Sequence, residues 1–184
     1  MLQTMGERAK AAEPVMRTLS TEKKNQALLQ TAEDLVKKQE DILVANEIDV
    51  KAGKEAGMSE GLLDRLALNP DRIEAMAEGL RQLAGLEDPI GEVLGMKKRP
   101  NGLMIGQKRV PLGVVGIIYE ARPNVTADAF GLCFKTGNVV ILKGGSDALH
   151  SNQAIVSCIR SSLSKCQITP DAIQFIEDTS REVT

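Results

Sequence analysis

From residue 112 onwards the sequence alternates between short apolar runs and amphipathic segments, and this alternation restricts the fold more than any other feature. The runs occupy residues 112–119 (LGVVGIIY), 139–142 and 173–176, and helical patterns lie at 124–136 and between Ala148 and Leu163. The first run is almost wholly apolar, which is typical of a parallel strand buried on both faces. This β-α-β-α-β order predicts an α/β fold with right-handed crossovers and a partial, doubly wound, Rossmann-like parallel sheet.

The first 93 residues follow a helical period instead. Apolar residues recur there every three or four positions, which predicts four or five amphipathic helices before residue 86. Ser20 or Thr21 is expected to cap the second helix. Asn69 followed by Pro70 is the pattern of an N-cap and a first helical residue, so another helix is expected to begin there.

Residues 94–111 separate these two regions. The helical period stops, and two extended stretches flank the turn sequence Pro100-Asn101-Gly102, so we expect a hairpin or a pair of extended arms. The basic run at residues 97–99 is interpreted as a solvated strand face rather than a nucleic-acid site.

Composition excludes several classes of protein. Lys and Arg number 23 against 25 Asp and Glu, which gives a net charge of −2, and aromatic residues make up only 2% of the chain. A basic footprint and stacking platforms for nucleic acid are both missing, so no nucleic-acid partner is expected. The sequence has no 18-residue apolar run and no signal peptide, so we expect no membrane association and a cytoplasmic location.

The cysteines and the histidine predict no metal site. Cys133, Cys158 and Cys166 form no CxxC pair, and His150 is the one histidine, so the spacing of a zinc site is not met. Cys133 lies on the apolar face of its predicted helix and is interpreted as a buried structural thiol. His150 is expected at the surface.

The third apolar run is followed only by residues 177–184, which contain no helix to cover the sheet. Three strands also make a small sheet for this architecture. We therefore expect the chain to be part of a longer protein.

Two loops at the expected carboxyl ends of the strands are candidate binding sites, because ligands of open α/β sheets bind at that edge. Neither contains a GxGxxG or P-loop motif. In the second loop, Lys143 can donate to a ribose or phosphate, Gly144 and Gly145 permit close approach, and Ser146 lies where helix N–H groups converge. The alternative is a tight turn in which Ser146 is only an N-cap.

The first loop runs from Glu120 to Asn124. The Asn124 amide can stabilise a developing oxyanion, although from sequence alone an N-cap is the favoured role, with Asp128 suited to the helix dipole. Glu120 and Arg122 can bind a substrate or can pair with each other. The residues alone leave these alternatives open.

The stretch from 109 to 152 contains YEARPNVTAD and ILKGGSDA, and it closely resembles the gamma-glutamyl phosphate reductases, a family within the aldehyde dehydrogenase superfamily. The resemblance extends through essentially all 184 residues. It implies an oxidoreductase that uses NADPH to reduce L-glutamate 5-phosphate to L-glutamate 5-semialdehyde and phosphate, a step of proline biosynthesis. The chemistry of the superfamily is attack by a cysteine thiolate followed by hydride transfer from the cofactor.

The resemblance also implies roles for particular residues. Asn124 matches the asparagine that stabilises the oxyanion, and Lys143 matches the lysine that binds the adenosine ribose, with Gly144, Gly145 and Ser146 beside it. Ser146 suits the 2′-phosphate of NADP better than Asp147 does. The nucleophilic cysteine belongs to a downstream catalytic domain, and none of the three cysteines matches it.

On this interpretation, residues 1–93 are the helical part of the cofactor domain and residues 112–184 are its β-α-β-α-β part. The arm at 94–111 resembles the region through which such enzymes form homo-oligomers. The chain alone is expected to be inactive. The alternative is a non-catalytic nucleotide-binding or assembly module.

Overall fold

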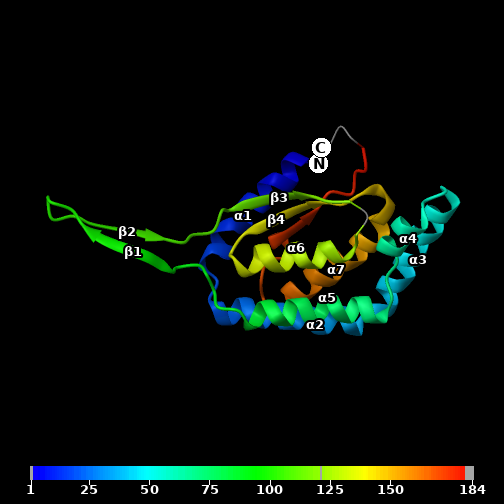
Figure 1. Cartoon of the computed structure of the whole chain (residues 1–184), viewed down its shortest axis with the longest axis horizontal. Coiled ribbons are helices and arrows are strands. Elements are labelled where there is room, and N and C mark those ends of the chain that lie inside the picture. Colours follow the sequence, from blue (N-terminus) through cyan, green and yellow to red (C-terminus); the bar gives the residue numbers. More distant parts are fainter. Residues whose placement is uncertain (1, 121, 181–184) are drawn as a thin grey trace.

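The computed structural model describes residues 2–120 and 122–180. Helices fill the N-terminal half, a long hairpin follows, and a small parallel sheet with its crossover helices completes the chain (Figure 1). The helices are α1 (Leu2–Thr18), α2 (Thr21–Lys37), α3 (Gln39–Glu55), α4 (Glu60–Leu66), α5 (Pro70–Gly85), α6 (Asn124–Lys135) and α7 (Leu149–Lys165). The strands are β1 (Val93–Lys98), β2 (Met104–Lys108), β3 (Val114–Ile118), β4 (Val139–Lys143) and β5 (Ile173–Phe175), and the 3-10 turns are η1 (Ser146–Ala148) and η2 (Pro170–Ala172).

The predicted helix starts in the N-terminal half are confirmed. Ser20 Oγ accepts a hydrogen bond from the backbone N–H of Lys23 at 3.2 Å, so Ser20 rather than Thr21 caps α2. Asn69 Oδ1 accepts from the N–H of Arg72 at 2.8 Å at the start of α5. These side chains satisfy backbone donors that have no partner within the helix.

The sheet lies between helices on its two faces. Its strand order is β3-β4-β5 with parallel pairing throughout, and α6 and α7 are the two crossovers. Because right-handed crossovers between successive neighbours fall on one face, α6 and α7 pack together there, and α1 covers the other face (Figure 1). Helices α2 and α5 pack on the outer side of α6 and α7, which adds a further helical layer.

The expectation that the first strand is buried on both faces is wrong. β4 is the central, buried strand, whereas β3 lies at the edge with alternating exposure, and Ile118 is 66% exposed. Val115 and Ile117 pack against the core, while Val114 and Ile118 face outwards. An apolar run shows that a strand is suited to burial, but the number of covered faces depends on its neighbours in the sheet.

The hairpin is confirmed as an extended arm. β1 and β2 pair antiparallel and project from the body of the molecule (Figure 1). Gly102 adopts a φ of +91° in the turn, and Asn101 Oδ1 accepts from the N–H of Leu103, as expected for this turn sequence. Every residue of both strands is exposed. The exposed apolar side chains of the arm include Val93, Leu94, Met96, Leu103, Met104 and Ile105.

A buried carboxylate joins the helical layers α2 and α7. Asp34 is 1% exposed and accepts hydrogen bonds from Ser162 Oγ and Lys165 Nζ, both at 2.7 Å. Burial acts to raise the pKa of Asp34, but the bonds from Lys165 and Ser162 outweigh it and hold the pKa below its ordinary value. The charged carboxylate is therefore favoured by folding.

Acid is expected to weaken this contact. Because the folded-state pKa is depressed, the stabilisation is present above the unfolded-state pKa of about 3.9 and is lost as pH falls through the folded value. The free energy of unfolding, measured by urea titration between pH 7 and pH 3, should fall more steeply for the wild type than for Asp34→Asn. Parallel curves for the two proteins would contradict this role of Asp34.

Candidate functional site

The two candidate loops begin side by side at the carboxyl edge of the sheet. Ile118 at the end of β3 pairs with Lys143 at the end of β4, and the N–H of Tyr119 donates to the Lys143 carbonyl at 3.0 Å. Parallel register therefore brings together Ile118 and Lys143, which lie 25 positions apart in the sequence. Two cavities open around these loops, and we call them the loop cavity and the helix cavity.

The loop cavity has a volume of about 340 Å³ and lies between the two loops and α4. Four residues predicted from the sequence line it together, namely Glu120, Arg122, Gly145 and Ser146. The remaining lining residues are Leu62, Arg65, Tyr119 and Asp147. Lys143 and Gly144 do not line it, although they belong to the same loop.

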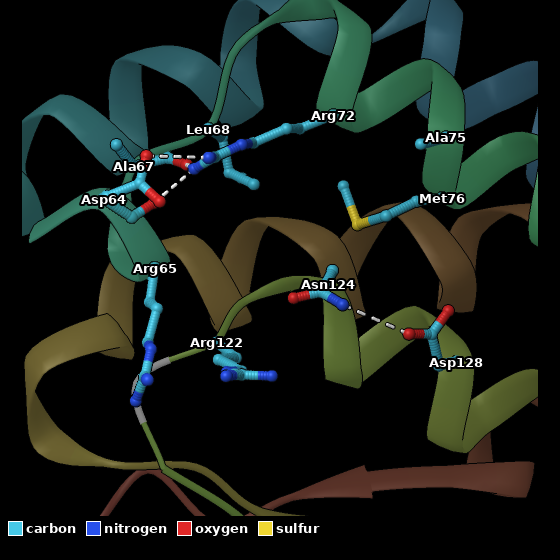
Figure 2. Close-up of a pocket in the computed structure, with 10 residues that line it drawn as sticks. All are labelled: Asp64, Arg65, Ala67, Leu68, Arg72, Ala75, Met76, Arg122, Asn124 and Asp128. Atoms are coloured by element: carbon cyan, nitrogen blue, oxygen red, sulfur yellow. Dashed lines mark hydrogen bonds and ion pairs between the residues drawn. The ribbon is translucent and has the colours of Figure 1, made fainter. Parts of the chain in front are cut away.

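The helix cavity has a similar volume of about 340 Å³ and lies between α4, α5 and the start of α6 (Figure 2). It is lined by Asp64, Arg65, Ala67, Leu68, Arg72, Ala75, Met76, Arg122, Asn124 and Asp128. Arg65 and Arg122 line both cavities, so they lie at the junction between them. The volume is within the range of small-molecule sites.

Asn124 faces the helix cavity and does not cap α6. It is the first residue of that helix, Pro123 holds the N-cap position, and no side chain caps the helix. The Asn124 amide instead donates from Nδ2 to Asp128 Oδ2 at 3.2 Å, one helical turn along (Figure 2). Desolvation raises the pKa of Asp128, and the bond from Asn124 opposes that rise. The contact orients the amide and leaves its second N–H for a bound group.

Lys143 is held by the chain itself. Its side chain is largely buried, and Nζ donates to the backbone carbonyls of Asp178 at 3.1 Å and Ser180 at 3.0 Å. The ammonium group has three N–H donors, so one is left after these two bonds.

The alternative of Ser146 as a helix N-cap is wrong. Ser146 begins the 3-10 turn η1, without a side-chain cap, and α7 begins only at Leu149. The first N–H groups of α7 are bound by a residue from another helix, because Asp49 of α3 accepts from the N–H groups of His150 at 3.3 Å and Ser151 at 2.7 Å. These N–H groups at the start of α7 are therefore not available to bind a ligand.

Asp49 belongs to a buried polar network that the sequence did not indicate. Its carboxylate also accepts from Ser151 Oγ at 2.6 Å and contacts His150 Nδ1 at 2.7 Å. Asn46, one turn earlier on α3, donates to Ser151 Oγ and to the Leu66 carbonyl. This network joins α3, the start of α7 and the end of α4, which forms one wall of both cavities. His150 is about half exposed, close to the surface position expected.

A second polar network lies beneath the loops. Tyr119 Oη lies 2.6 Å from Thr126 Oγ1, which donates to Asn152 Oδ1 at 2.9 Å. Since that hydroxyl donates to Asn152, it accepts from the Tyr119 hydroxyl. Burial raises the pKa of Tyr119 to about 12, so the hydroxyl stays protonated. Asn152 Nδ2 is buried without a hydrogen-bond partner among the described residues.

Gly144 is required by internal packing. A Cβ at this position would collide with Asn152 Nδ2 and lie 3.3 Å from the Tyr119 ring. The expected role of Gly144 in admitting a ligand is therefore not needed to explain the glycine. Gly144→Ala should lower the free energy of unfolding by about 2 kcal/mol, because overpacking displaces a buried side chain.

Urea denaturation of Gly144→Ala measures that loss, and Gly6→Ala in α1 is the matched control because no atom lies within 4 Å of its added Cβ. The free energy of unfolding of Gly6→Ala should equal that of the wild type or be slightly higher. Equal stability of Gly144→Ala and the wild type would show that the loop accommodates a methyl group.

The three cysteines are buried, free thiols. Burial raises the pKa of Cys133 and of Cys166, and raises that of Cys158 to about 11. Thiols in this state are protonated near neutral pH and are poor nucleophiles. The interpretation of Cys133 as a structural thiol agrees with its place beside Phe130 and Phe134, whose ring centroids lie 5.1 Å apart.

The comparison with known proteins agrees with this architecture. The sequence profile described as "Aldehyde dehydrogenase family" matches residues 2–184. The chain belongs to the aldehyde dehydrogenase family. This is a family of oxidoreductases, and its fold accounts for the helical start followed by a parallel sheet.

Within the aldehyde dehydrogenase family, the similarity points to one enzyme. The chain is 58% identical to the gamma-glutamyl phosphate reductases of Moorella thermoacetica and Heliobacterium modesticaldum, over 98% and 99% of its length. The crystal structure of the Thermotoga maritima gamma-glutamyl phosphate reductase superposes with a TM-score of 0.96 at 45% identity and covers 99% of this chain.

The chain spans less than half the length of these relatives. It corresponds to 43% of the Moorella protein, 44% of the Heliobacterium protein and 44% of the Thermotoga structure, and it matches their N-terminal portion. A more distant aldehyde dehydrogenase fold, that of the Methanocaldococcus jannaschii protein GapN, was determined with NADP and is 19% identical with a TM-score of 0.67. Among the described residues, no helix has both the length and the apolar content to cross a membrane.

Proposed function

We infer that this chain supplies the N-terminal part of an NADPH-dependent reductase that converts L-glutamate 5-phosphate to L-glutamate 5-semialdehyde and phosphate. Identity of 58% to gamma-glutamyl phosphate reductases supports the reaction. The observation that carries the site is that the two loops meet at one sheet edge, where Asn124 lines the helix cavity, Ser146 lines the loop cavity and Arg122 lines both. A cofactor and an acyl phosphate that react must bind in such adjacent positions.

The donors at the loop cavity fit a nicotinamide dinucleotide. The Ser146 hydroxyl can bond the 2′-phosphate of NADP, and the buried, unpartnered amide of Asn152 lies directly under this loop. Lys143 does not line the cavity, but it belongs to the same loop and keeps one N–H after its two bonds, which we assign to a ribose hydroxyl; Gly144 and Gly145 complete the loop. When bound, the cofactor supplies the hydride; these residues hold and orient it.

On the substrate side, we assign Asn124 to the oxyanion that forms when a nucleophile attacks the acyl carbon. The amide is oriented by Asp128 and presents N–H groups, which stabilise negative charge. Glu120 and Arg122 are assigned to substrate binding. The nucleophilic thiol is assigned to the catalytic domain that the relatives contain, since the three cysteines here are buried and protonated. Their free state accords with a cytoplasmic enzyme.

The hairpin is assigned to assembly with a second copy. Its strands expose five large apolar residues, and Leu103 beside the turn is a sixth, on an arm that projects from the body. Such an arm suits burial against another subunit better than exposure to water. A homo-oligomer is therefore proposed for the complete enzyme.

A fusion protein tests the proposed activity. Residues 1–184 replace the matching N-terminal segment of the Moorella reductase, and NADPH oxidation is followed with L-glutamate 5-phosphate. We expect turnover by the fusion and none by the 184-residue chain alone, because the chain has no activated thiol among its cysteines. A folded fusion that binds NADPH without turnover would contradict the proposal and favour the non-catalytic module.

A further inference from the structure

Two arginines from different parts of the chain meet at the junction of the two cavities. Arg65 lies on α4 within the helical half, and Arg122 lies in the loop after β3. Figure 2 shows Arg65 descending from α4 towards the loop that carries Arg122. Both residues are exposed, so their guanidinium groups are accessible to a solute.

Within residues 2–120 and 122–180, neither arginine forms an ion pair. Of the seven other arginines that the structure describes, six do so and only Arg99 in the hairpin does not; Arg72 lines the helix cavity and pairs with Asp64 at 2.8 Å. The further examples are Arg8, Arg17, Arg81, Arg109 and Arg160. The arginines at the junction therefore differ from these surface arginines in lacking a carboxylate.

The acidic residues around the junction form no ion pair with Arg65 or Arg122 among the residues that the structure describes. Asp64 is engaged by Arg72, and Asp128 accepts the Asn124 amide. Glu120 and Asp147 line the loop cavity, but no ion pair joins either of them to an arginine in the described part of the chain. Two adjacent guanidinium groups repel each other, and an anion that binds both removes that cost.

We propose that Arg65 and Arg122 together form a binding site for a phosphoryl group. A guanidinium group offers a planar pair of donors that matches phosphate oxygens, and two such groups balance the charge of a dianion. A single carboxylate would leave one positive charge uncompensated. The identity of the natural ligand rests on the proposed function: the phosphoryl group of the acyl phosphate or a phosphate of the dinucleotide.

The position of Arg65 is fixed by contacts around the short helix α4. Arg72 of α5 donates to the backbone carbonyls of Asp64 and Ala67, the latter at 2.7 Å. Asn46 of α3 donates to the Leu66 carbonyl at 2.9 Å and accepts from the N–H of Leu68 at 2.7 Å. These bonds hold the backbone on both sides of Arg65, so the position of this residue on α4 is fixed before the anion binds.

Direct binding of inorganic phosphate to the 184-residue chain tests the site without any catalysis. Isothermal titration calorimetry is run on the wild type, Arg65→Gln, Arg122→Gln and the control Arg81→Gln, whose side chain pairs with Glu74 and Glu78 on α5. Each junction variant should bind phosphate about tenfold more weakly or worse, because a charge-assisted contact is lost. The control should bind as the wild type does, and unchanged affinity in both junction variants would overturn the proposal.

The same variants in the fusion distinguish the two sources of the phosphoryl group. A rise of about tenfold in the KM for the acyl phosphate, with unchanged KM for NADPH and kcat, assigns the site to the substrate. The converse pattern assigns it to the dinucleotide. If neither KM changes while turnover is normal, the phosphoryl site is not used and the proposal fails. A fusion without turnover contradicts the reductase function alone, because phosphate titration still measures the site.

Discussion

Replacing Asn124 with alanine lowers the kcat of the fusion enzyme by about 10²–10³, the loss found when an oxyanion donor is removed from an acyl-transfer site. The reason is geometric. Asn124 begins α6 in the helix cavity, and its Nδ2 is held by Asp128 at 3.2 Å, so the second N–H is available to the reacting oxygen. Alanine retains the helix but has no donor. Steady-state kinetics in NADPH and acyl phosphate measure the change.

Two further variants separate a donor role from a structural one. Asn124→Asp keeps the shape but offers a carboxylate, which accepts hydrogen bonds and repels an oxyanion, so its kcat should be at least as low as that of the alanine variant. Thr136→Ala at the far end of α6 is the control and should retain kcat. A kcat within threefold of wild type for both Asn124 variants would remove Asn124 from the reaction.

Replacing Asp49 with alanine should lower the free energy of unfolding by about 3 kcal/mol, because the buried donors of the start of α7 and of Ser151 lose their acceptor at once. Asp49 is 4% exposed, and its carboxylate receives bonds from two backbone N–H groups and one hydroxyl. Urea denaturation of the 184-residue chain, followed by circular dichroism, measures the loss.

Glu47→Ala is the matched control for Asp49, since Glu47 lies on the same helix and is exposed. It should change stability by less than about 0.5 kcal/mol. Asp49→Asn retains one acceptor oxygen, so its free energy of unfolding should lie between those of Asp49→Ala and Glu47→Ala. If Asp49→Ala is as stable as the control, the start of α7 does not depend on this cap.

Local structure was predictable where one short segment contains its own signal. Ser20 and Asn69 cap their helices as expected, and the Pro100-Asn101-Gly102 turn closes the hairpin. The order of strands and helices after residue 112 was equally clear. In each case the cause lies within a few residues of the chain, namely a capping side chain, a glycine with positive φ or an apolar period.

The site could be predicted only in part. Parallel pairing requires the loops after β3 and β4 to be neighbours, so Arg122 and Ser146 could be placed at one edge in advance. Arg65 could not be placed at the site in advance, because nothing in the sequence distinguishes an exposed arginine on a seven-residue helix from other surface residues. Asp49 could not either, since a helix N-terminus in the sequence does not show that a carboxylate 101 positions away occupies it.

The sequence by itself determined the α/β class, the helical N-terminal half, the projecting hairpin and the resemblance to the gamma-glutamyl phosphate reductases, because each depends on local pattern or on the specificity of one continuous motif. The tertiary structure decided that β3 is an edge strand and that Asn124 is oriented by Asp128. It also decided that residue 144 has no room for a Cβ, because the Asn152 side chain occupies that space. It also placed Arg65 beside Arg122. These are contacts between segments far apart in the chain, and they follow from which faces pack together rather than from the order of residues.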